Sequence, residues 1–180
     1  MLPKNVIHIK NVKQETEYTC GVSALRSILL YYGIKVTEKE IEYLARSTYE
    51  HGTDTKDLIR VARYYGLRTR CSENMTLEDL KKWLDKKRPT ILCVQRPWSD
   101  YYIRNMLVGH YIVAIGYDEK YIYFEDPIQN KGYRGRIPIK EFIKRWKDQD
   151  SNQEIKIRWG LATWKENPIF PQKIYKVKNI

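Results

Sequence analysis

The hydrophobic residues of this 180-residue chain change their spacing midway, and that change constrains the fold more than any other feature. Up to about residue 88, apolar residues recur every three to four positions, which is the period of an amphipathic helix. From "PTILCVQ" at 89–95 onward, apolar residues follow the continuous or alternating patterns of buried strands. Helices first and an antiparallel sheet afterwards predict an α+β fold, with an N-terminal helical lobe followed by a sheet lobe.

Four helices are expected in the first half of the chain. The first runs from about Cys20 to Tyr32, with Thr19 as its N-cap and Gly33 as the residue that ends it. The next three are predicted from "TEKEIEYLARS", "TDTKDLIRVARYYG" and "MTLEDLKKWLDKK". Their boundary signals are a capping box of Thr37 and Glu40, the terminal Gly66, and the cap Thr76.

The second half is expected to hold strands and one short helix. "HYIVAIGYDEKYIYFEDP" predicts a hairpin, because two β-branched and aromatic runs flank a loop at 118–120. "IPIKEFIKRW" predicts a short helix, and "IKIRWGLATW" predicts a last strand. Near the N-terminus, the weak alternation from Val6 to Val12 predicts a short edge strand.

Length and composition favour one domain, 1–180, with a core at about 5–165 and a basic tail at 166–180. No run approaches the roughly 18 apolar residues that a membrane span needs, and "MLPKNVIHIK" lacks the features of a signal peptide. The three cysteines form no CxxC pair, so a disulfide scaffold or a zinc site is disfavoured. These features favour a cytoplasmic protein, unless a signal was removed before this numbering. They leave the oligomeric state open.

The positive charge is concentrated toward the C-terminus. The net charge is +11, and residues 131–180 carry 13 Lys and Arg against 5 Asp and Glu. Two interpretations stay open: this third either binds an anionic partner, such as nucleic acid, acidic lipid or an acidic peptide, or is a solubilising face. Nucleic acid is disfavoured, because no nucleic-acid motif accompanies the charge.

Cys20 is the first candidate for chemistry. It stands where a helix begins, so unpaired N–H groups and the positive end of the helix dipole favour its thiolate form. Gly21 beside it would let a substrate backbone come close. Gln14, on the loop that enters the helix, would donate its amide to an oxyanion together with the backbone N–H of Cys20. Cys71 and Cys93 are expected to be inert structural residues.

A nucleophile needs a base, and His110 at the start of the hairpin is the candidate. With the loop at 118–120, paired residue numbers in the hairpin sum to 238, so His110 and Asp126 become diagonal neighbours on one face. A carboxylate there would orient the imidazole and stabilise its charged form. Asp118 is the rival carboxylate, but its place in a turn explains it locally.

In this order, these residues resemble the papain-like cysteine peptidases of family thirty-nine, best known as bacteriocin-processing domains that cut leader peptides after a double glycine. The matching pieces are Gln14 followed by Cys20 and Gly21, the helix end "YYG", and then "HYIVAIGYD", "FEDP", "EFIKRW" and "WG". They cover about residues 5 to 165. The chain looks most like the stand-alone relatives of that family, and no ATPase or membrane domain is expected after the match, so coupled export is not implied.

The resemblance implies a papain-like fold and a hydrolase of the thiol protease type. It implies Cys20 as nucleophile, His110 as general base and acid, Asp126 as the orienting group and Gln14 as oxyanion donor. No metal or organic cofactor is expected. The expected partner is a peptide or protein substrate, of acidic character if the basic third takes part. Leader-cutting members have an acidic residue before the cysteine, so Thr19 puts leader specificity, rather than catalysis, in question.

Two alternatives stay open. An acyl- or peptidyl-transferase would use the same residues but resolve the acyl-enzyme with an amine instead of water. A non-catalytic module would keep the peptidase fold and use its basic surface to grip an anionic partner. A thiol-reactive probe of Cys20 would separate the second alternative from the first.

Overall fold

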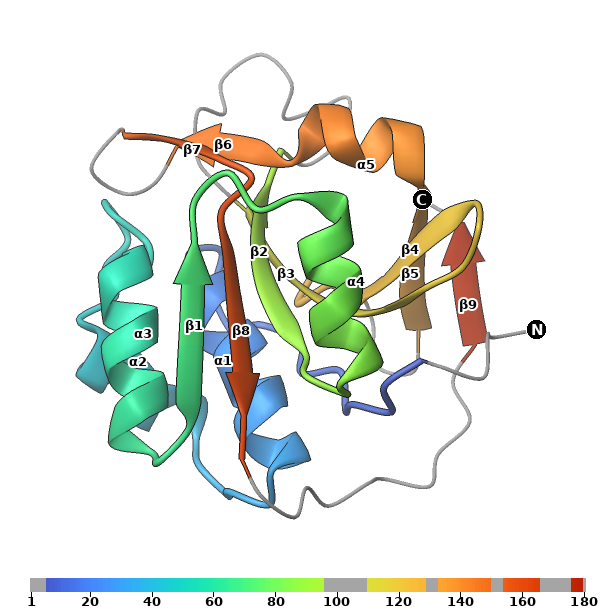
Figure 1. The fold of residues 1–180 in the computed structure, drawn as a ribbon. Helices are drawn as coiled ribbons and strands as arrows, with labels where there is room; N and C mark the ends of the chain where they lie inside the picture. Colours follow the sequence, from blue (N-terminus) through green and yellow to red (C-terminus); the bar gives the residue numbers. More distant parts are fainter. Residues whose placement is uncertain (1–5, 96–109, 129–132, 150–153, 166–175, 180) are drawn as a thin grey trace.

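The computed structural model describes residues 6–95, 110–128, 133–149, 154–165 and 176–179, and it has an α+β architecture (Figure 1). Within these residues a sheet has the order β1-β8-β2-β3-β4-β5-β9, antiparallel except for the parallel pair of β5 and β9. The helices are α1 (Cys20–Tyr31), α2 (Glu38–Ala45), α3 (Thr55–Tyr64), α4 (Leu77–Asp85) and α5 (Ile139–Arg145). The sheet strands are β1 (Arg68–Ser72), β2 (Thr90–Val94), β3 (His110–Tyr117), β4 (Tyr121–Glu125), β5 (Tyr133–Pro138), β8 (Gly160–Trp164) and β9 (Lys176–Asn179). The predicted α+β class is confirmed.

Helices cover both faces of the central strands. In Figure 1, α4 lies in front of β2 and β3, while α1 lies behind the sheet with α2 and α3 beside it. All five residues of β2 are buried, as expected for a strand that is covered on both faces. On α1, Leu25 and Ile28 have no exposed surface. The core is therefore built around α1 and the middle of the sheet.

The helix predictions are confirmed at four starts or ends and wrong in one detail. Thr37 and Thr76 each form a capping box with the acidic residue three positions on, and Gly33 and Gly66 end their helices at positive φ. Thr19 precedes α1, but its side chain does not cap the helix. Its Oγ1 instead exchanges hydrogen bonds with the backbone N–H and carbonyl of Thr16. The N–H groups of the first turn are thus left without a side-chain cap.

The N-terminal segment is not the predicted edge strand. Residues 6–14 belong to no helix or strand, and Val6, Ile7 and Ile9 are buried. The N–H of Ile7 donates to the carbonyl of Ile115 at 2.7 Å. The segment packs so closely that a Cβ on Gly116 would lie 2.7 Å from Val6 Cγ2.

The segment "IKIRWGLATW" forms two strands rather than one. β7 (Ile155–Ile157) pairs with β6 (Lys147–Gln149) in a separate two-stranded sheet, while β8 joins the main sheet. Arg158 lies between them at a φ of 50°, a left-handed conformation that no strand continues through. β1, β5, β6 and β9 were not expected from the sequence. Of the predicted tail at 166–180, the structure describes 176–179, which form β9. None of the described helices is long and apolar enough to cross a bilayer.

Candidate active site

Cys20 is the first residue of α1 and is half-buried. The loop before it is held by α2: Glu38 Oε1 accepts the N–H of Glu15 at 2.9 Å, and the Tyr18 hydroxyl donates to Glu42 at 2.6 Å. Glu38 is 1% exposed and also lies 3.8 Å from Arg26 of α1. Because the loop is anchored to α2 and α1, the thiol has a fixed position relative to the start of its helix.

Gly21 packs against protein rather than facing a substrate. A Cβ at this position would lie 3.0 Å from both Thr53 Cβ and Tyr111 Cδ2, closer than side chains normally approach. The hydroxyl of Tyr111 in turn donates to the carbonyl of Thr53 at 3.0 Å. The expectation that Gly21 opens space for a substrate backbone is therefore wrong. The missing side chain instead lets the start of α1 approach β3.

His110 and Asp126 form a buried hydrogen-bonded pair beside this helix start. His110 Nε2 lies 2.8 Å from Asp126 Oδ1, and the two residues are 4% and 1% exposed. Asp126 Oδ1 also accepts the N–H of Ile128 at 3.0 Å, which fixes the carboxylate. Since the carboxylate occupies Nε2, the nitrogen left for Cys20 is Nδ1.

The hairpin register agrees with the prediction at the site and departs from it near the turn. Val113 pairs with Glu125 and Ala114 with Phe124, both in the predicted register. A bulge then follows, so that Gly116 pairs with Tyr123. Ile115 is the extra residue, and its carbonyl accepts the N–H of Ile7. Beside the loop Tyr117 pairs with Ile122, not with Tyr121 as predicted, and the bulge restores the predicted register on the side of His110 and Asp126.

The thiol of Cys20 and the imidazole of His110 shift each other's pKa values. Burial alone would raise the pKa of Cys20, but its hydrogen bond to His110, the charge of His110, and the N–H groups of Tyr111 and Gly21 lower it overall. Burial alone would lower the pKa of His110, but the charge and hydrogen bond of Asp126, followed by those of Cys20, raise it to about 10. The pair titrates as a coupled unit, and at neutral pH these shifts favour a thiolate beside an imidazolium.

Gln14 is tied to the same region by its backbone, whose N–H donates to the carbonyl of Pro127 at 2.8 Å. Its side-chain Nε2 donates to the carbonyl of Thr16 at 2.6 Å, on the loop that precedes Cys20. Its Oε1 is buried and has no hydrogen-bond partner among the described residues. A primary amide carries two N–H donors, so one remains beyond the bond to Thr16.

The rival carboxylate Asp118 serves the hairpin turn. Its Oδ1 accepts the N–H groups of Lys120 and Tyr121, both at 2.7 Å, and its Oδ2 accepts the hydroxyl of Tyr123. These hydrogen bonds are those of an aspartate that stabilises a turn. The structure thus brings Asp126, and not Asp118, to His110.

The other two cysteines lie in different surroundings. Cys93 is fully buried on β2, and burial raises the pKa of Cys71 on β1. None of the three cysteines forms a disulfide. In the described ranges, no group of three or more His, Cys, Asp or Glu side chains is placed to hold a metal ion.

Two contributors to the site were missed by sequence reasoning. The backbone N–H of Tyr111 interacts with Cys20, and Thr53 packs against Gly21 while accepting the Tyr111 hydroxyl. Tyr111 follows the predicted base, so its N–H could have been anticipated at the site. No local signal marks Thr53, which is brought there only by the packing of helices.

A cysteine at a helix start, facing a His–Asp pair on an antiparallel sheet, is the arrangement of the papain-like cysteine peptidases. The chain belongs to the Peptidase_C39 like family, whose model matches residues 6–154. It therefore has the fold of a cysteine peptidase family, as the sequence resemblance implied.

Individual relatives agree with this assignment. A protein of Methanothermobacter thermautotrophicus, described as uncharacterized, is 34% identical over 132 residues, which are 73% of this chain and 78% of that protein. The transport/processing ATP-binding protein ComA of Streptococcus pneumoniae is 27% identical over 135 residues. That match spans 74% of this chain and only 17% of ComA.

Solved structures share the fold at low sequence identity. A double glycine motif protease from an AMS/PCAT transporter, in complex with the leader peptide, superposes with a TM-score of 0.65 at 20% identity. The comparison covers 90% of this chain and 95% of that one. The peptidase domain of Streptococcus ComA gives a TM-score of 0.64 at 21% identity, over 87% and 97% of the two chains.

Proposed function

We propose that this protein is a cysteine peptidase that hydrolyses a peptide bond through a thioacyl-enzyme on Cys20. One observation carries the proposal: the buried 2.8 Å contact of His110 with Asp126, next to a helix-start thiol whose pKa is lowered by the same imidazole. This arrangement supplies a nucleophile, a proton carrier and an orienting carboxylate in one place. The family membership supports the same reaction class.

The reaction follows from the two protonation states that the site favours. The Cys20 thiolate attacks the carbonyl carbon of the scissile bond, and the carbonyl electrons move to its oxygen to give a tetrahedral oxyanion. The His110 imidazolium then donates its proton to the leaving amine as the C–N bond breaks, which leaves a thioester on Cys20. Neutral His110 next takes a proton from water, whose oxygen attacks the thioester. Collapse of this second intermediate releases the acid and restores the pair.

Two donors are proposed for the oxyanion. The backbone N–H of Cys20 lies at the uncapped start of α1, where the helix dipole favours negative charge. The second N–H of the Gln14 amide is the other candidate, since the first is bonded to Thr16. Donors of this kind act because they point at charge that develops only in the transition state.

The proposed substrate class is a peptide. The related AMS/PCAT protease is described in complex with a leader peptide, and transfer of that substrate class to this chain is part of the proposal. Thr19, buried directly before the nucleophile, separates this chain from the leader-cutting pattern with an acidic residue there. We therefore propose peptide hydrolysis without assigning double-glycine specificity.

The test is a mass-spectrometric survey of products from a diverse peptide library that includes double-glycine sequences. We expect cleavage by the native protein and none by Cys20→Ala or His110→Ala. Cys71→Ala is the matched control, because it removes a partly exposed thiol from β1 without touching the site. Cleavage that persists in Cys20→Ala would contradict the proposal.

A second arm addresses transfer to an amine. Adding a peptide with a free N-terminus at millimolar concentration lets it compete with water for the thioester. Hydrolysis releases the acyl half of the substrate only as a free carboxylic acid, whereas a transferase would join that half to the added peptide as the main product. The two outcomes differ by mass and need no assumption about the sequence preference.

A further inference from the structure

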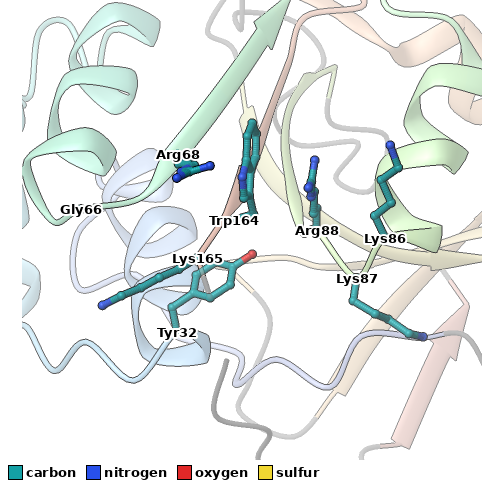
Figure 2. Close-up of a pocket in the computed structure, with 8 residues that line it drawn as sticks. All are labelled: Tyr32, Gly66, Arg68, Lys86, Lys87, Arg88, Trp164 and Lys165. Atoms are coloured by element: carbon teal, nitrogen blue, oxygen red, sulfur yellow. The ribbon is translucent and has the colours of Figure 1, made fainter. Parts of the chain in front are cut away.

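A pocket of about 590 Å³ lies at the opposite end of α1 from Cys20 and is lined by cations (Figure 2). Its cationic side chains are Arg68, Lys86, Lys87, Arg88 and Lys165. None of the described residues that line it is acidic. The volume is that of a small-molecule site, and the charge selects for an anion.

The sheet register gathers these residues from three separate segments. Arg68, the first residue of β1, pairs with Trp164, the last residue of β8. Arg88 lies two residues before β2, whose first residue Thr90 pairs with Ala162 of β8. The convergence is thus fixed by backbone pairing in the sheet.

Arg88 is held in place by aromatic rings. Its guanidinium carbon lies 4.2 Å from the ring centre of Trp164 and 5.2 Å from that of Trp83, and these two indoles stack at 5.9 Å. Figure 2 shows Trp164 between Arg68 and Arg88, with the Tyr32 ring below. Neither arginine forms an ion pair with a carboxylate in the described part of the chain. Two planar guanidinium groups therefore keep their N–H donors available.

The negative C-terminal ends of nearby helices offset part of the pocket's positive charge, but not all of it. The C-terminal ends of α1, α3 and α4 lie near the pocket, through Tyr32, Gly66 and Lys86. Each helix end carries about half a negative charge, so three ends offset about 1.5 of the four positive charges of Arg68, Lys86, Arg88 and Lys165, with Lys87 left out because it has an interaction of its own. A clear positive excess remains for a ligand to neutralise.

We propose that this pocket binds a small anion that carries two or more linked phosphate groups. A terminal phosphate group carries a charge of about −1.5 to −2 at pH 7 and three acceptor oxygens. Each acidic side chain of a peptide carries a single negative charge. Arginine forks bind phosphate oxygens in pairs of hydrogen bonds. Lys86 and Lys165 also line the pocket, and their flexible stems allow their ammonium groups to reach further oxygens.

The proposed anion site is separate from the peptidase centre. Cys20 and Tyr31 are the ends of a 12-residue helix, which is about 18 Å long. Along the sheet, β2 runs from the pocket to Val94, which pairs with His110. Anion binding can therefore be measured without any peptide substrate, and its outcome is independent of the proposed hydrolysis.

The test is isothermal titration calorimetry with sodium tripolyphosphate in about 0.1 M NaCl, where long-range charge effects are screened. We expect saturable binding with one site per chain. Arg68→Glu should weaken it at least tenfold, and since Arg68 is an exposed strand-end residue, the change leaves the core intact. Arg88→Lys keeps the charge but loses the fork, and should also weaken binding.

The matched control is Lys39→Ala with Lys140→Ala, which lowers the net charge by the same amount as Arg68→Glu. Both lysines are exposed and lie on α2 and α5, away from the pocket. The control should bind tripolyphosphate with unchanged affinity. Equal weakening in the control and in Arg68→Glu, or binding that never saturates, would overturn the proposal.

Two further ligands identify the chemistry. A nucleoside triphosphate that binds like tripolyphosphate supports a site for the phosphates alone, and tighter binding supports added contact of its base with Trp164 or Tyr32. Hexaglutamate is the competing class. If it bound more tightly than tripolyphosphate and lost affinity in Arg68→Glu, the pocket would be a peptide site and the phosphate assignment would be wrong.

Discussion

His110 Nε2 lies 2.8 Å from Asp126 Oδ1, although the two residues are sixteen positions apart and belong to the two arms of a hairpin. The contact depends on the register of β3 and β4 beyond a bulge at Ile115. The N-terminal segment supports that bulge through the bond from Ile7 to Ile115. The geometry of the candidate site is thus coupled to a segment that lies far from it in the sequence.

The state of the thiol gives the first prediction. Cys20 should react with iodoacetamide at about pH 6.5, two units below the ordinary thiol pKa, because His110 and two N–H groups stabilise its thiolate. Cys71, whose pKa is raised by burial, and the fully buried Cys93 should remain unlabelled on that timescale. Peptide mapping after brief alkylation measures this. Equal labelling of all three thiols would contradict an activated Cys20.

A comparison of two aspartates gives the second prediction. Asp126→Ala should lower kcat by at least about 10²-fold, because His110 loses both its orientation and the charge that supports its imidazolium. Asp126→Asn should be milder, since an amide oxygen still orients the ring. The matched control is Asp118→Asn in the same hairpin, which should change kcat by less than about two-fold, or 0.4 kcal/mol.

The control variant Asp118→Asn should also change the stability of the protein. Asp118 Oδ2 accepts a hydrogen bond from the hydroxyl of Tyr123. Burial alone would raise the pKa of the Asp118 carboxyl, but this bond and two backbone N–H groups lower the pKa overall. Asp118→Asn should therefore lower the melting temperature while leaving turnover intact. Loss of turnover in Asp118→Asn with activity kept in Asp126→Ala would reverse the assignment of the two carboxylates.

Elements with local signals were predictable from the sequence. Thr37 and Thr76 start their helices by capping boxes, and Gly33 and Gly66 end theirs at positive φ. These devices need only a few neighbouring residues, so no tertiary contact has to be known. The His110–Asp126 contact was predicted from a hairpin register that holds at Val113 and Glu125 but not beside the loop, where Tyr117 pairs with Ile122. The prediction holds at the site because the bulge at Ile115 compensates for the shift at the turn.

Features that depend on distant contacts were not predictable. β1 reads "RTRCS", which has no strand pattern, and it becomes a strand only because β8 pairs with it. The bulge at Ile115 has no local signal, and its contacts are with Val6 and Ile7, more than a hundred positions earlier in the chain. The close approach of Gly21 to Thr53 likewise follows from the packing of helices on the sheet.

The pKa of His110 leads to a prediction on pH. Because the folded-state pKa of about 10 lies above the ordinary value of 6.5, protonated His110 stabilises the fold fully below about pH 6.5. That contribution is lost as pH rises toward 10. The alkaline limb of kcat/KM should fall in the same upper range. Asp126→Asn removes the charge that raises this pKa, so the limb should move to lower pH, which a pH–rate profile measures. A limb that stays in place in Asp126→Asn would contradict this coupling.

Packing at the helix start gives a fourth prediction. In Gly21→Ala, the new Cβ would meet Thr53 and Tyr111 at 3.0 Å, so the start of α1 must move. Overpacking of this kind costs about 1–3 kcal/mol of stability. It should also lower kcat, because Cys20 moves relative to His110. Denaturant unfolding and turnover measure the two effects. Retention of both stability and activity would show that the helix start tolerates the displacement.

Gln14 gives the last prediction, because its side chain can act on catalysis or merely hold its loop. As an oxyanion donor, Gln14→Ala should lower kcat by about 10²–10³-fold with little change in KM. Gln14→Glu should be at least as harmful, since a carboxylate repels the oxyanion. The loop should stay in place in both variants, because the backbone N–H of residue 14 still reaches Pro127 and Glu38 still accepts the N–H of Glu15.

A separate variant tests the loop itself. Glu38→Ala removes the buried carboxylate that holds Glu15 but leaves the Gln14 amide in the chain. It should lower stability and raise KM, since a loosened loop weakens substrate binding and geometry together. Gln14→Ala should instead keep its melting temperature and lose only kcat. If the two variants gave the same pattern of kcat, KM and melting temperature, Gln14 would be a structural residue of the loop, and the oxyanion would depend on the N–H of Cys20 alone.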